Sequence, residues 1–380
     1  MVDARPALDP RRTGVGQYAA NIVRHLPGAA PDDEIVAWYL DVRGVVRRGP
    51  RFAVAPNLVE RATRLPTRLF QPVSWRLGLP RVEWLAGRFD ALLATNFLPP
   101  PTRLEGVVPV VHDLAFDLFP ETAPHVDETW HSRFASWLVR APRVIVPSKA
   151  TRDDLVRLHD VDPGKVDVVH HGADAHAFHP ATEGLVAEVR DRHGIEGPYV
   201  LFLGGLEPRK NLEALVRAFG QADVDVTLVI AGGKVRWIPE AEEAVDRAIE
   251  EMPSGPRSRI VRTGYVGGRE KRALLSGAQA LAYPSLYEGF GLPVLEAFAA
   301  SVPVLTSNIS SLPEVAGDAA LLVDPHDPSA IAKGLEQLCG DEDLRRVLVA
   351  AGMARVTSFT WERCARQTLD TLHGAAGASG

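Results

Sequence analysis

Residues 285–296 read SLYEGFGLPVLE, and this stretch decides how the chain is interpreted. Two carboxylates, Glu288 and Glu296, flank a turn made of Gly289, Phe290, Gly291 and Leu292. Residues 280–285 (ALAYPS) predict a short apolar strand before the turn, and residues 293–300 (PVLEAFAA) predict a helix after it. Such a turn presents backbone N–H groups and the positive end of a helix dipole. It therefore predicts a site for a phosphate or a polyhydroxylated ligand, with one carboxylate on each side.

The composition is that of a globular protein with room for two domains. The chain has 380 residues, of which 46% are hydrophobic. It contains no apolar run of the roughly 18 residues that a transmembrane helix needs, and its first residues (MVDARPALDPRR) lack the apolar core of a signal peptide. The only cysteines, Cys339 and Cys364, cannot form a disulfide framework or a cysteine-rich zinc site. We therefore expect a cytoplasmic protein.

Apolar segments alternate with helical segments in two successive halves of the chain. Short, fully apolar strands separated by helices predict parallel sheets with helices on both faces. Ser148 is predicted to cap a helix over residues 149–158. The break between the halves is expected in the Gly-, His- and Pro-rich residues 171–184. The predicted strands are residues 34–39, 91–94, 107–111, 143–146 and 166–170 in the first half, and 199–203, 226–231, 260–263, 281–283, 303–305 and 320–323 in the second.

The string at 285–296, with SNISSLPEVAGDAALLVD at 307–324 and HDPSAI at 326–331, resembles the E-x7-E region of the retaining glycosyltransferases of family 4. The resemblance extends over nearly the whole chain. It implies the α/β GT-B fold, in which two doubly wound Rossmann-like domains face each other across a cleft. An acceptor-side domain is expected at residues 1–178, with a terminal helix at 359–373 packing back onto it. A nucleotide-sugar-binding domain is expected at residues 185–355.

The activity that this resemblance implies is the retaining transfer of a hexose from a nucleotide-diphosphate sugar to an acceptor hydroxyl. The acceptor would be a glycan, a lipid-linked molecule or a small molecule. The segment GGLEPRKN at 204–211 resembles the bacterial O-antigen mannosyltransferases, which favours mannose from GDP-mannose. A UDP-sugar donor and a catalytically inactive sugar-nucleotide-binding protein are the alternatives. The sugar nucleotide is a substrate, so no cofactor is expected, and no metal ion is expected either.

Two cations, Arg209 and Lys210, follow the predicted strand at 199–203. Fixed cations directed at a leaving diphosphate stabilise the transition state more than the ground state. The resemblance implies this role for Lys210. The family's separate arginine corresponds to Gly205 here, so Arg209 is expected to replace it.

Three further regions receive roles from the resemblance. Gly14 and Gly16 form a glycine loop before a helix predicted at 17–26, and this loop would approach the phosphates. His112 follows the apolar run 107–111; a lone histidine there is more often structural, but the resemblance implies that it faces the donor sugar. Val266 belongs to the region that receives the nucleotide base. Of the two carboxylates, Glu296 would hold ribose hydroxyls and Glu288 would position the sugar.

Residues 43–103 contain eleven arginines and three acidic residues, although the whole chain has a net charge of −6. Phe70, Trp75 and Trp84 lie among these arginines. One interpretation is a solvated basic face. The other is peripheral contact with the anionic inner face of a membrane, where a lipid-linked acceptor would be found. Nucleic acid is not expected, because no nucleic-acid-binding motif accompanies the arginines.

The chain departs from the family pattern at its start. Family members have a full apolar strand before the position of Asp3, whereas only Met1 and Val2 precede it here. We expect either a shortened first strand or a natural start upstream of Met1.

Overall fold

The computed structural model describes residues 1–8, 14–41, 51–52, 55–64, 70, 77–124, 126–173, 179–235 and 237–377. The chain divides into two compact units. The first consists of Met1–Leu114, Asp127–Gly172 and Thr360–Gly380, and the second of Ala115–Val126 and Ala173–Phe359. The terminal segment thus groups with the first unit.

Ala115–Val126 groups with the second unit, although the division expected from the sequence placed all of residues 1–178 in the first domain. Two contacts account for this grouping. The ring of Phe119 lies 6.1 Å from that of Tyr287, and Trp237 donates a hydrogen bond from Nε1 to the carbonyl of Thr122 at 3.0 Å.

The first unit contains a parallel sheet with the strand order β3-β2-β1-β4-β5. Its strands are β1 (Val2–Asp3), β2 (Ile35–Leu40), β3 (Leu58–Thr63), β4 (Leu92–Ala94) and β5 (Val107–Pro109), and a separate parallel pair is formed by β6 (Val144–Val146) and β7 (Val166–Val168). A bridge between Val110 and Ile145 joins this pair to β5. Strand β3 was not predicted, because this edge strand carries polar residues (LVERAT) in place of an apolar run.

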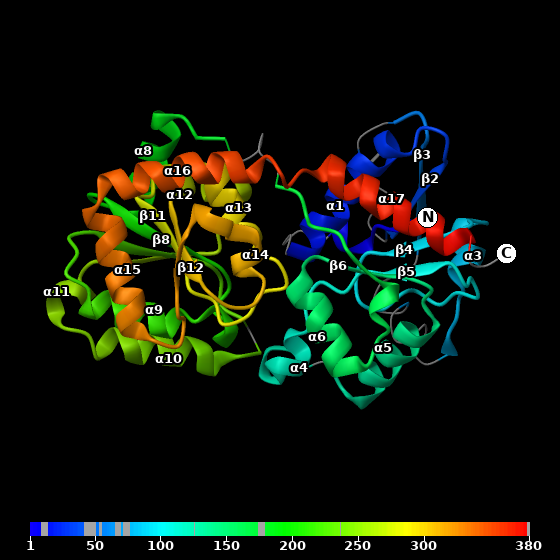
Figure 1. The fold of residues 1–380 in the computed structure, drawn as a ribbon, viewed down its shortest axis with the longest axis horizontal. Coiled ribbons are helices and arrows are strands. Elements are labelled where there is room, and N and C mark those ends of the chain that lie inside the picture. Colours follow the sequence, from blue (N-terminus) through cyan, green and yellow to red (C-terminus); the bar gives the residue numbers. More distant parts are fainter. Residues whose placement is uncertain are drawn as a thin grey trace. The chain divides into compact units, whose positions relative to one another are not determined.

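Helices α1 and α17, from the two ends of the chain, lie side by side in the first unit (Figure 1). Tyr18 and Ile22 of α1 share one apolar core with Cys364 and Leu372 of α17. Ser148 caps α6 by accepting a hydrogen bond from the amide of Thr151, as predicted. The helices of this unit are α1 (Gly14–Ala29), α3 (Val82–Ala86), α5 (Glu128–Arg140), α6 (Lys149–His159) and α17 (Trp361–Gly377), with short 3-10 helices η1 (Arg5–Leu8) and η3 (Pro163–Lys165).

The second unit contains a parallel sheet with the order β10-β9-β8-β11-β12-β13. Its strands are β8 (Tyr199–Leu203), β9 (Thr227–Ala231), β10 (Ile260–Gly264), β11 (Ala280–Tyr283), β12 (Val304–Ser307) and β13 (Leu321–Val323). The chain runs outward from β8 to β10 and then returns to the other side of β8 with β11. Strand order therefore reverses between β8 and β11, and ligands bind beyond the carboxyl ends of the strands at such a point.

Helices cover both faces of this second sheet (Figure 1). Leu201 of β8 packs into the core on one face, and its neighbours Val200 and Phe202 pack into the core on the other. This arrangement explains why the strand sequence is apolar throughout. The helices are α4 (Ala115–Leu118), α8 (Glu183–His193), α9 (Leu212–Gln221), α10 (Pro239–Glu250), α11 (Ser254–Arg257), α12 (Gly268–Gly277), α13 (Leu292–Ala299), α14 (Leu312–Ala316), α15 (Pro328–Gly340) and α16 (Glu342–Val356), with 3-10 helices η2 (Pro120–Thr122), η4 (Pro208–Lys210) and η5 (Gly317–Ala319). Within the described residues, no helix combines the length and apolarity needed to span a membrane.

Candidate active site

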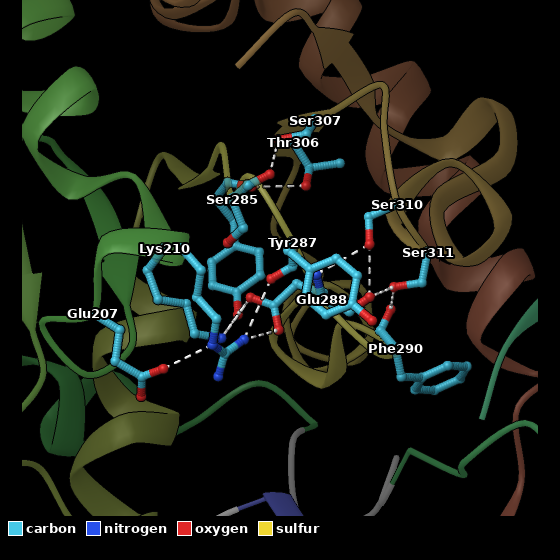
Figure 2. A network of polar contacts seen from close by, with 12 residues as sticks. Glu207, Lys210, Ser285, Tyr287, Glu288, Phe290, Thr306, Ser307, Ser310 and Ser311 are labelled. Atoms are coloured by element: carbon cyan, nitrogen blue, oxygen red, sulfur yellow. Dashed lines mark hydrogen bonds and ion pairs between the residues drawn. The ribbon is translucent and has the colours of Figure 1, made fainter. Parts of the chain in front are cut away.

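Lys210 and Glu288 meet where the strand order of the second unit reverses. Lys210 lies at the end of η4, shortly after β8, and Glu288 lies five residues after the end of β11. The Lys210 Nζ atom is 2.5 Å from Glu288 Oε1, although the residues are 78 positions apart in the chain. Figure 2 shows Lys210 on one side of Glu288 and the loop serines Ser310 and Ser311 on the other. The topology thus brings together two of the predicted catalytic residues.

Arg209 completes this cluster of charges. Its Nη1 donates to Glu288 Oε2 at 3.1 Å and to the carbonyl of Tyr287 at 3.3 Å, and its Nε donates to Glu207 Oε2 at 2.7 Å. The positive charges of Arg209 and Lys210 are thus matched by the negative charges of Glu207 and Glu288. A diphosphate that binds these cations must compete with the two carboxylates.

Both members of the central ion pair are buried, with Glu288 7% and Lys210 9% exposed. Burial acts to raise the pKa of Glu288, but Lys210 and Arg209 together outweigh it and hold this pKa at about 2. Burial lowers the pKa of Lys210, and the neighbouring Arg209 lowers it further, while Glu288 opposes both effects. Glu288 is therefore a carboxylate at neutral pH, restricted to a narrow range of positions by its cations.

Two serines, which had not been selected from the sequence, stabilise the turn after Glu288 by hydrogen bonds. The hydroxyls of Ser310 and Ser311 both donate to the carbonyl of Glu288 at 2.8 Å, and the Glu288 amide donates to Ser310 Oγ at 3.1 Å. Ser311 also donates to the carbonyl of Phe290 at 2.9 Å. These serines lie within residues 307–324, a segment that resembles family 4, and this resemblance is the sequence signal that could have identified them.

Gly291 has a conformation that explains the glycine at this position. Its φ is +107°, and it forms the N-cap of α13. A Cβ atom on Gly291 would lie 2.8 Å from Leu312 Cδ2, so a side chain would be strained in its backbone and crowded by its neighbour. The predicted donor-binding turn, Gly289 to Leu292, therefore ends at the first turn of a helix, as the sequence suggested.

The second carboxylate of the motif, Glu296, belongs to a different ion pair. It lies on α13 and is 4% exposed. The Nζ atom of Lys271, on α12, is 2.6 Å from Glu296 Oε1. Lys271 was not predicted as a site residue, because nothing in the spacing of α12 and α13 along the chain shows that these helices are neighbours. Each carboxylate of the motif thus has a lysine of its own.

The structure places the other predicted donor-binding residues of the second unit at neighbouring strand ends. Gly205 follows β8, and Val266 lies between β10 and α12, where it is half-buried. The backbone approaches itself closely here: a Cβ atom on Gly232, after β9, would lie 1.6 Å from the carbonyl oxygen of Gly204. Only glycine fits at Gly232.

Gly14 and Gly16 lie within a helix, which corrects the prediction that they form a loop before it. Gly14 is the first residue of α1, and Gly16 is buried in its first turn. Thr13, the residue before this turn, lies outside the described residues.

His112 contacts groups of the first unit through both of its ring nitrogens. Its Nε2 is 2.8 Å from the carbonyl of Thr95, and its Nδ1 is 3.4 Å from Nε2 of His171. A carbonyl only accepts, so His112 carries its proton on Nε2, and His171 donates to Nδ1. Burial lowers the pKa of His112 and favours the neutral ring. From the sequence, the His112 side chain was expected to face the donor sugar, and its contact with His171 was not predicted.

Part of the basic segment at 43–103 is described. Phe70 is buried, with its ring 5.8 Å from that of Trp38, whereas Trp75 lies outside the described residues. Trp84 is 64% exposed, and the guanidinium of Arg81 lies 5.4 Å from its ring centroid. Leu77 is 69% exposed. An aromatic, an aliphatic and a cationic side chain thus reach solvent within eight residues.

The part of the chain that the structure describes contains no group of three or more His, Cys, Asp or Glu side chains arranged to hold a metal ion.

Comparison with known proteins assigns the family. The model described as Glycosyltransferase Family 4 matches residues 12–177, and the model described as Glycosyl transferases group 1 matches residues 187–355. O-antigen chain mannosyltransferase B of Escherichia coli is 31% identical over 376 residues, which cover 94% of this chain and 95% of that protein. Serotype-specific mannosyltransferase WbdA of Escherichia coli is 28% identical over 251 residues, which cover 65% of this chain but only 30% of the larger WbdA.

Among solved structures, sucrose-phosphate synthase from Thermosynechococcus elongatus has the same fold, with a TM-score of 0.74 at 21% identity. The match covers 96% of this chain and 94% of that one. The extent of these matches, and the two doubly wound units with a charged cluster at a strand-order reversal, lead to one assignment. The chain belongs to glycosyltransferase family 4, has the GT-B fold and is a hexosyltransferase.

Proposed function

We propose that this enzyme transfers mannose from GDP-mannose, with retention of configuration, to a hydroxyl of a glycan or lipid-linked acceptor. The observation that carries the choice of sugar is the 31% identity to an O-antigen chain mannosyltransferase over almost the whole length of both proteins. The Lys210–Glu288–Arg209 cluster supplies the charged groups that this reaction uses.

In this proposal Lys210 and Arg209 bind the diphosphate, together with amides of the turn from Gly289 to Leu292. Glu296 holds the ribose hydroxyls, and Glu288 positions the sugar. When the sugar leaves, the diphosphate gains charge, and cations already in place stabilise it without reorganisation. Transfer of Lys210 from Glu288 to the diphosphate would leave Glu288 lone pairs for sugar hydroxyls. Gly205 and Val266 keep their predicted donor-binding roles in this proposal. The roles expected for Gly14, Gly16 and His112 remain predictions.

The donor is tested by hydrolysis without acceptor. Wild-type enzyme is incubated separately with GDP-mannose, UDP-glucose and ADP-glucose, and released nucleoside diphosphate is measured. We expect release from GDP-mannose above the level given by Lys210→Ala. Preferential release from UDP-glucose would replace the GDP-mannose assignment. Tight nucleotide binding in a thermal-shift assay, with no release and no transfer to any acceptor, would support an inactive binding protein.

Glu296→Gln is expected to weaken GDP binding more than it slows chemistry. Ribose contacts are the same in the ground and transition states, so their loss raises KM while kcat changes little. The measurements are the Kd for GDP by calorimetry and the steady-state constants for GDP-mannose. Glu314→Gln is a matched control, because Glu314 lies on α14 of the same unit. A large loss of kcat with unchanged Kd would show that Glu296 acts on the reacting sugar instead.

Addition of EDTA is expected to leave the rate of transfer unchanged. Protein cations, Lys210 and Arg209, would neutralise the diphosphate in place of a metal ion. The check is the initial rate after EDTA treatment, compared with rates in added magnesium or manganese. Activity that appears only with added metal would contradict this mechanism.

The enzyme is expected to bind vesicles that contain anionic lipid and to bind neutral vesicles poorly. Each arginine near an anionic surface contributes about 1 kcal/mol, an attraction that falls off over a Debye length of about 8 Å. Binding should therefore fall steeply with salt. Trp84→Ala should weaken binding, whereas Trp237→Ala, at a similarly exposed tryptophan of the second unit, should not. Failure to bind either kind of vesicle, with full activity on a water-soluble acceptor, would favour a solvated basic face.

A further inference from the structure

Tyr283, the last residue of β11, lies inside the charged cluster of the candidate active site. Its side chain is completely buried. The phenol oxygen is 2.6 Å from Lys210 Nζ and 2.5 Å from Glu288 Oε1. One hydroxyl thus bridges the two charged side chains that the proposed mechanism separates when a diphosphate binds.

The direction of these hydrogen bonds follows from the chemistry of the partners. An ammonium group only donates, so the Tyr283 oxygen accepts from Lys210. The carboxylate of Glu288 only accepts, so Tyr283 donates its own proton to Glu288. Burial and the nearby carboxylate raise the pKa of the phenol well above its usual value, which keeps that proton in place. Tyr283 is a permanent hydrogen-bond donor to Glu288.

Tyr283 is also anchored more firmly than the two cations that share Glu288 with it. Its carbonyl accepts from Thr306 Oγ1 at 2.8 Å, its backbone is part of the central sheet, and its ring lies 6.4 Å from that of Phe202. Lys210 reaches Glu288 from a short 3-10 helix through a flexible stem with several rotatable bonds. If a diphosphate draws Lys210 away, the phenol stays where it is.

A second buried tyrosine of the same sheet shows what an ordinary structural phenol does. Tyr199, in β8, is also completely buried, and its hydroxyl donates to the backbone carbonyl of Leu274 at 2.7 Å. That bond satisfies a helix carbonyl and reaches no charged side chain. The two tyrosines are similar in burial and hydrogen-bond length, and they differ in the partner of the hydroxyl.

We infer that Tyr283 is a positioning residue for transfer, whose hydroxyl keeps the Glu288 carboxylate aligned while Lys210 turns to the donor diphosphate. This inference rests on the proposed function, because it requires Glu288 to act on the sugar. Tyr283 itself touches no reacting atom in this account. It acts through Glu288, so loss of its hydroxyl should lower the rate of sugar transfer more than it weakens nucleotide binding.

Tyr283→Phe removes the hydroxyl and keeps the ring. We expect kcat with GDP-mannose to fall by roughly 10- to 100-fold, because misalignment of a catalytic group has effects of that size. The KM for GDP-mannose and the Kd for GDP should stay within about threefold of wild type, since nucleotide contacts are retained. Tyr199→Phe should lower the melting temperature about as much as Tyr283→Phe does, and it should leave kcat unchanged. If the Tyr283→Phe protein binds GDP as tightly as wild type does, this binding also shows that the variant is folded.

A double-mutant cycle distinguishes action through Glu288 from a general effect on the core. In a Glu288→Gln background, Tyr283→Phe should lower kcat further by less than about twofold, because the partner has already been lost. A full effect in that background, or a kcat for Tyr283→Phe close to wild type, would overturn the inference. If wild-type enzyme turns over UDP-glucose instead, the donor assignment fails and the same cycle is measured with that donor. If no donor is turned over, the proposed function fails. The coupling between Tyr283 and Glu288 is then tested by urea unfolding of wild type, the two single variants and the double variant. Unfolding midpoints that shift additively would overturn this coupling as well.

Discussion

Lys210→Ala is expected to lower kcat for sugar transfer by about 10²–10³, the usual effect of removing one preorganised electrostatic stabiliser. Lys210 sits beyond the end of β8, at the strand-order reversal, with its Nζ in the charged cluster. The protein should remain folded, because Glu288 keeps its bonds to Arg209 and Tyr283 when the lysine is removed. The measurements are steady-state rates with GDP-mannose, together with the melting temperature.

Lys333→Ala is the matched control for this variant. Lys333 is an exposed lysine on α15 of the same unit, so its removal changes the net charge equally without touching the cluster. Its rates should match wild type. Activity of Lys210→Ala within about threefold of wild type would show that Lys210 does not stabilise the leaving group.

Glu288→Gln is expected to lower kcat strongly while leaving the Kd for GDP nearly unchanged, the reverse of Glu296→Gln. The amide keeps the size of the side chain but cannot accept from Lys210, Arg209 and Tyr283 through two charged oxygens. It would therefore hold a sugar hydroxyl weakly and in the wrong direction. If Glu288→Gln raised the Kd and spared kcat, the roles given to the two carboxylates would have to be exchanged.

The same variant should also be less stable at neutral pH, because loss of one member of a buried ion pair costs roughly 3–5 kcal/mol. The pKa of Glu288 is lowered from its usual value of 4.5 to about 2. A carboxyl with a lowered pKa contributes stability above the unfolded value and loses it as pH falls through the folded value. The stability difference between wild type and Glu288→Gln should thus be full above pH 4.5 and shrink as pH falls toward 2. Urea unfolding at several pH values measures this difference, and a constant difference over that range would contradict the assigned pKa.

The strands of the second unit were predicted closely from sequence, because most of them are short apolar runs between helices; the edge strand β10 (IVRTG) is the exception. Strand β8 was predicted at 199–203 and is observed there. The edge strand β3 was missed because its exposed side chains are polar and charged. A strand that is not fully buried does not need an apolar sequence, so there was no apolar pattern to detect. Strand β1 comprises Val2–Asp3 and pairs with both β2 and β4.

The candidate site was only partly predictable. Lys210, Glu288 and Glu296 were selected from their positions at strand ends and their likeness to the family string. Lys271 and Tyr283 were not, although each lies within 2.6 Å of a motif carboxylate. Tyr283 stands in an apolar strand, where a tyrosine is indistinguishable by pattern from any other core residue. The contact between His171 and His112 was missed because the two residues lie 59 positions apart in the chain.

By itself, the sequence determined the two α/β halves, the parallel sheets and the glycine turn between the two glutamates. These features are local: apolar runs, helix starts and glycines act on their own neighbourhood of the chain. The tertiary structure alone decided which lysine pairs with which glutamate, and that a tyrosine bridges the first of these pairs. Strand order determines such pairings, since the reversal between β8 and β11 places Lys210 beside a residue 78 positions away. Hydrophobic periodicity reports which residues are buried, but it carries no information about which buried residues become neighbours.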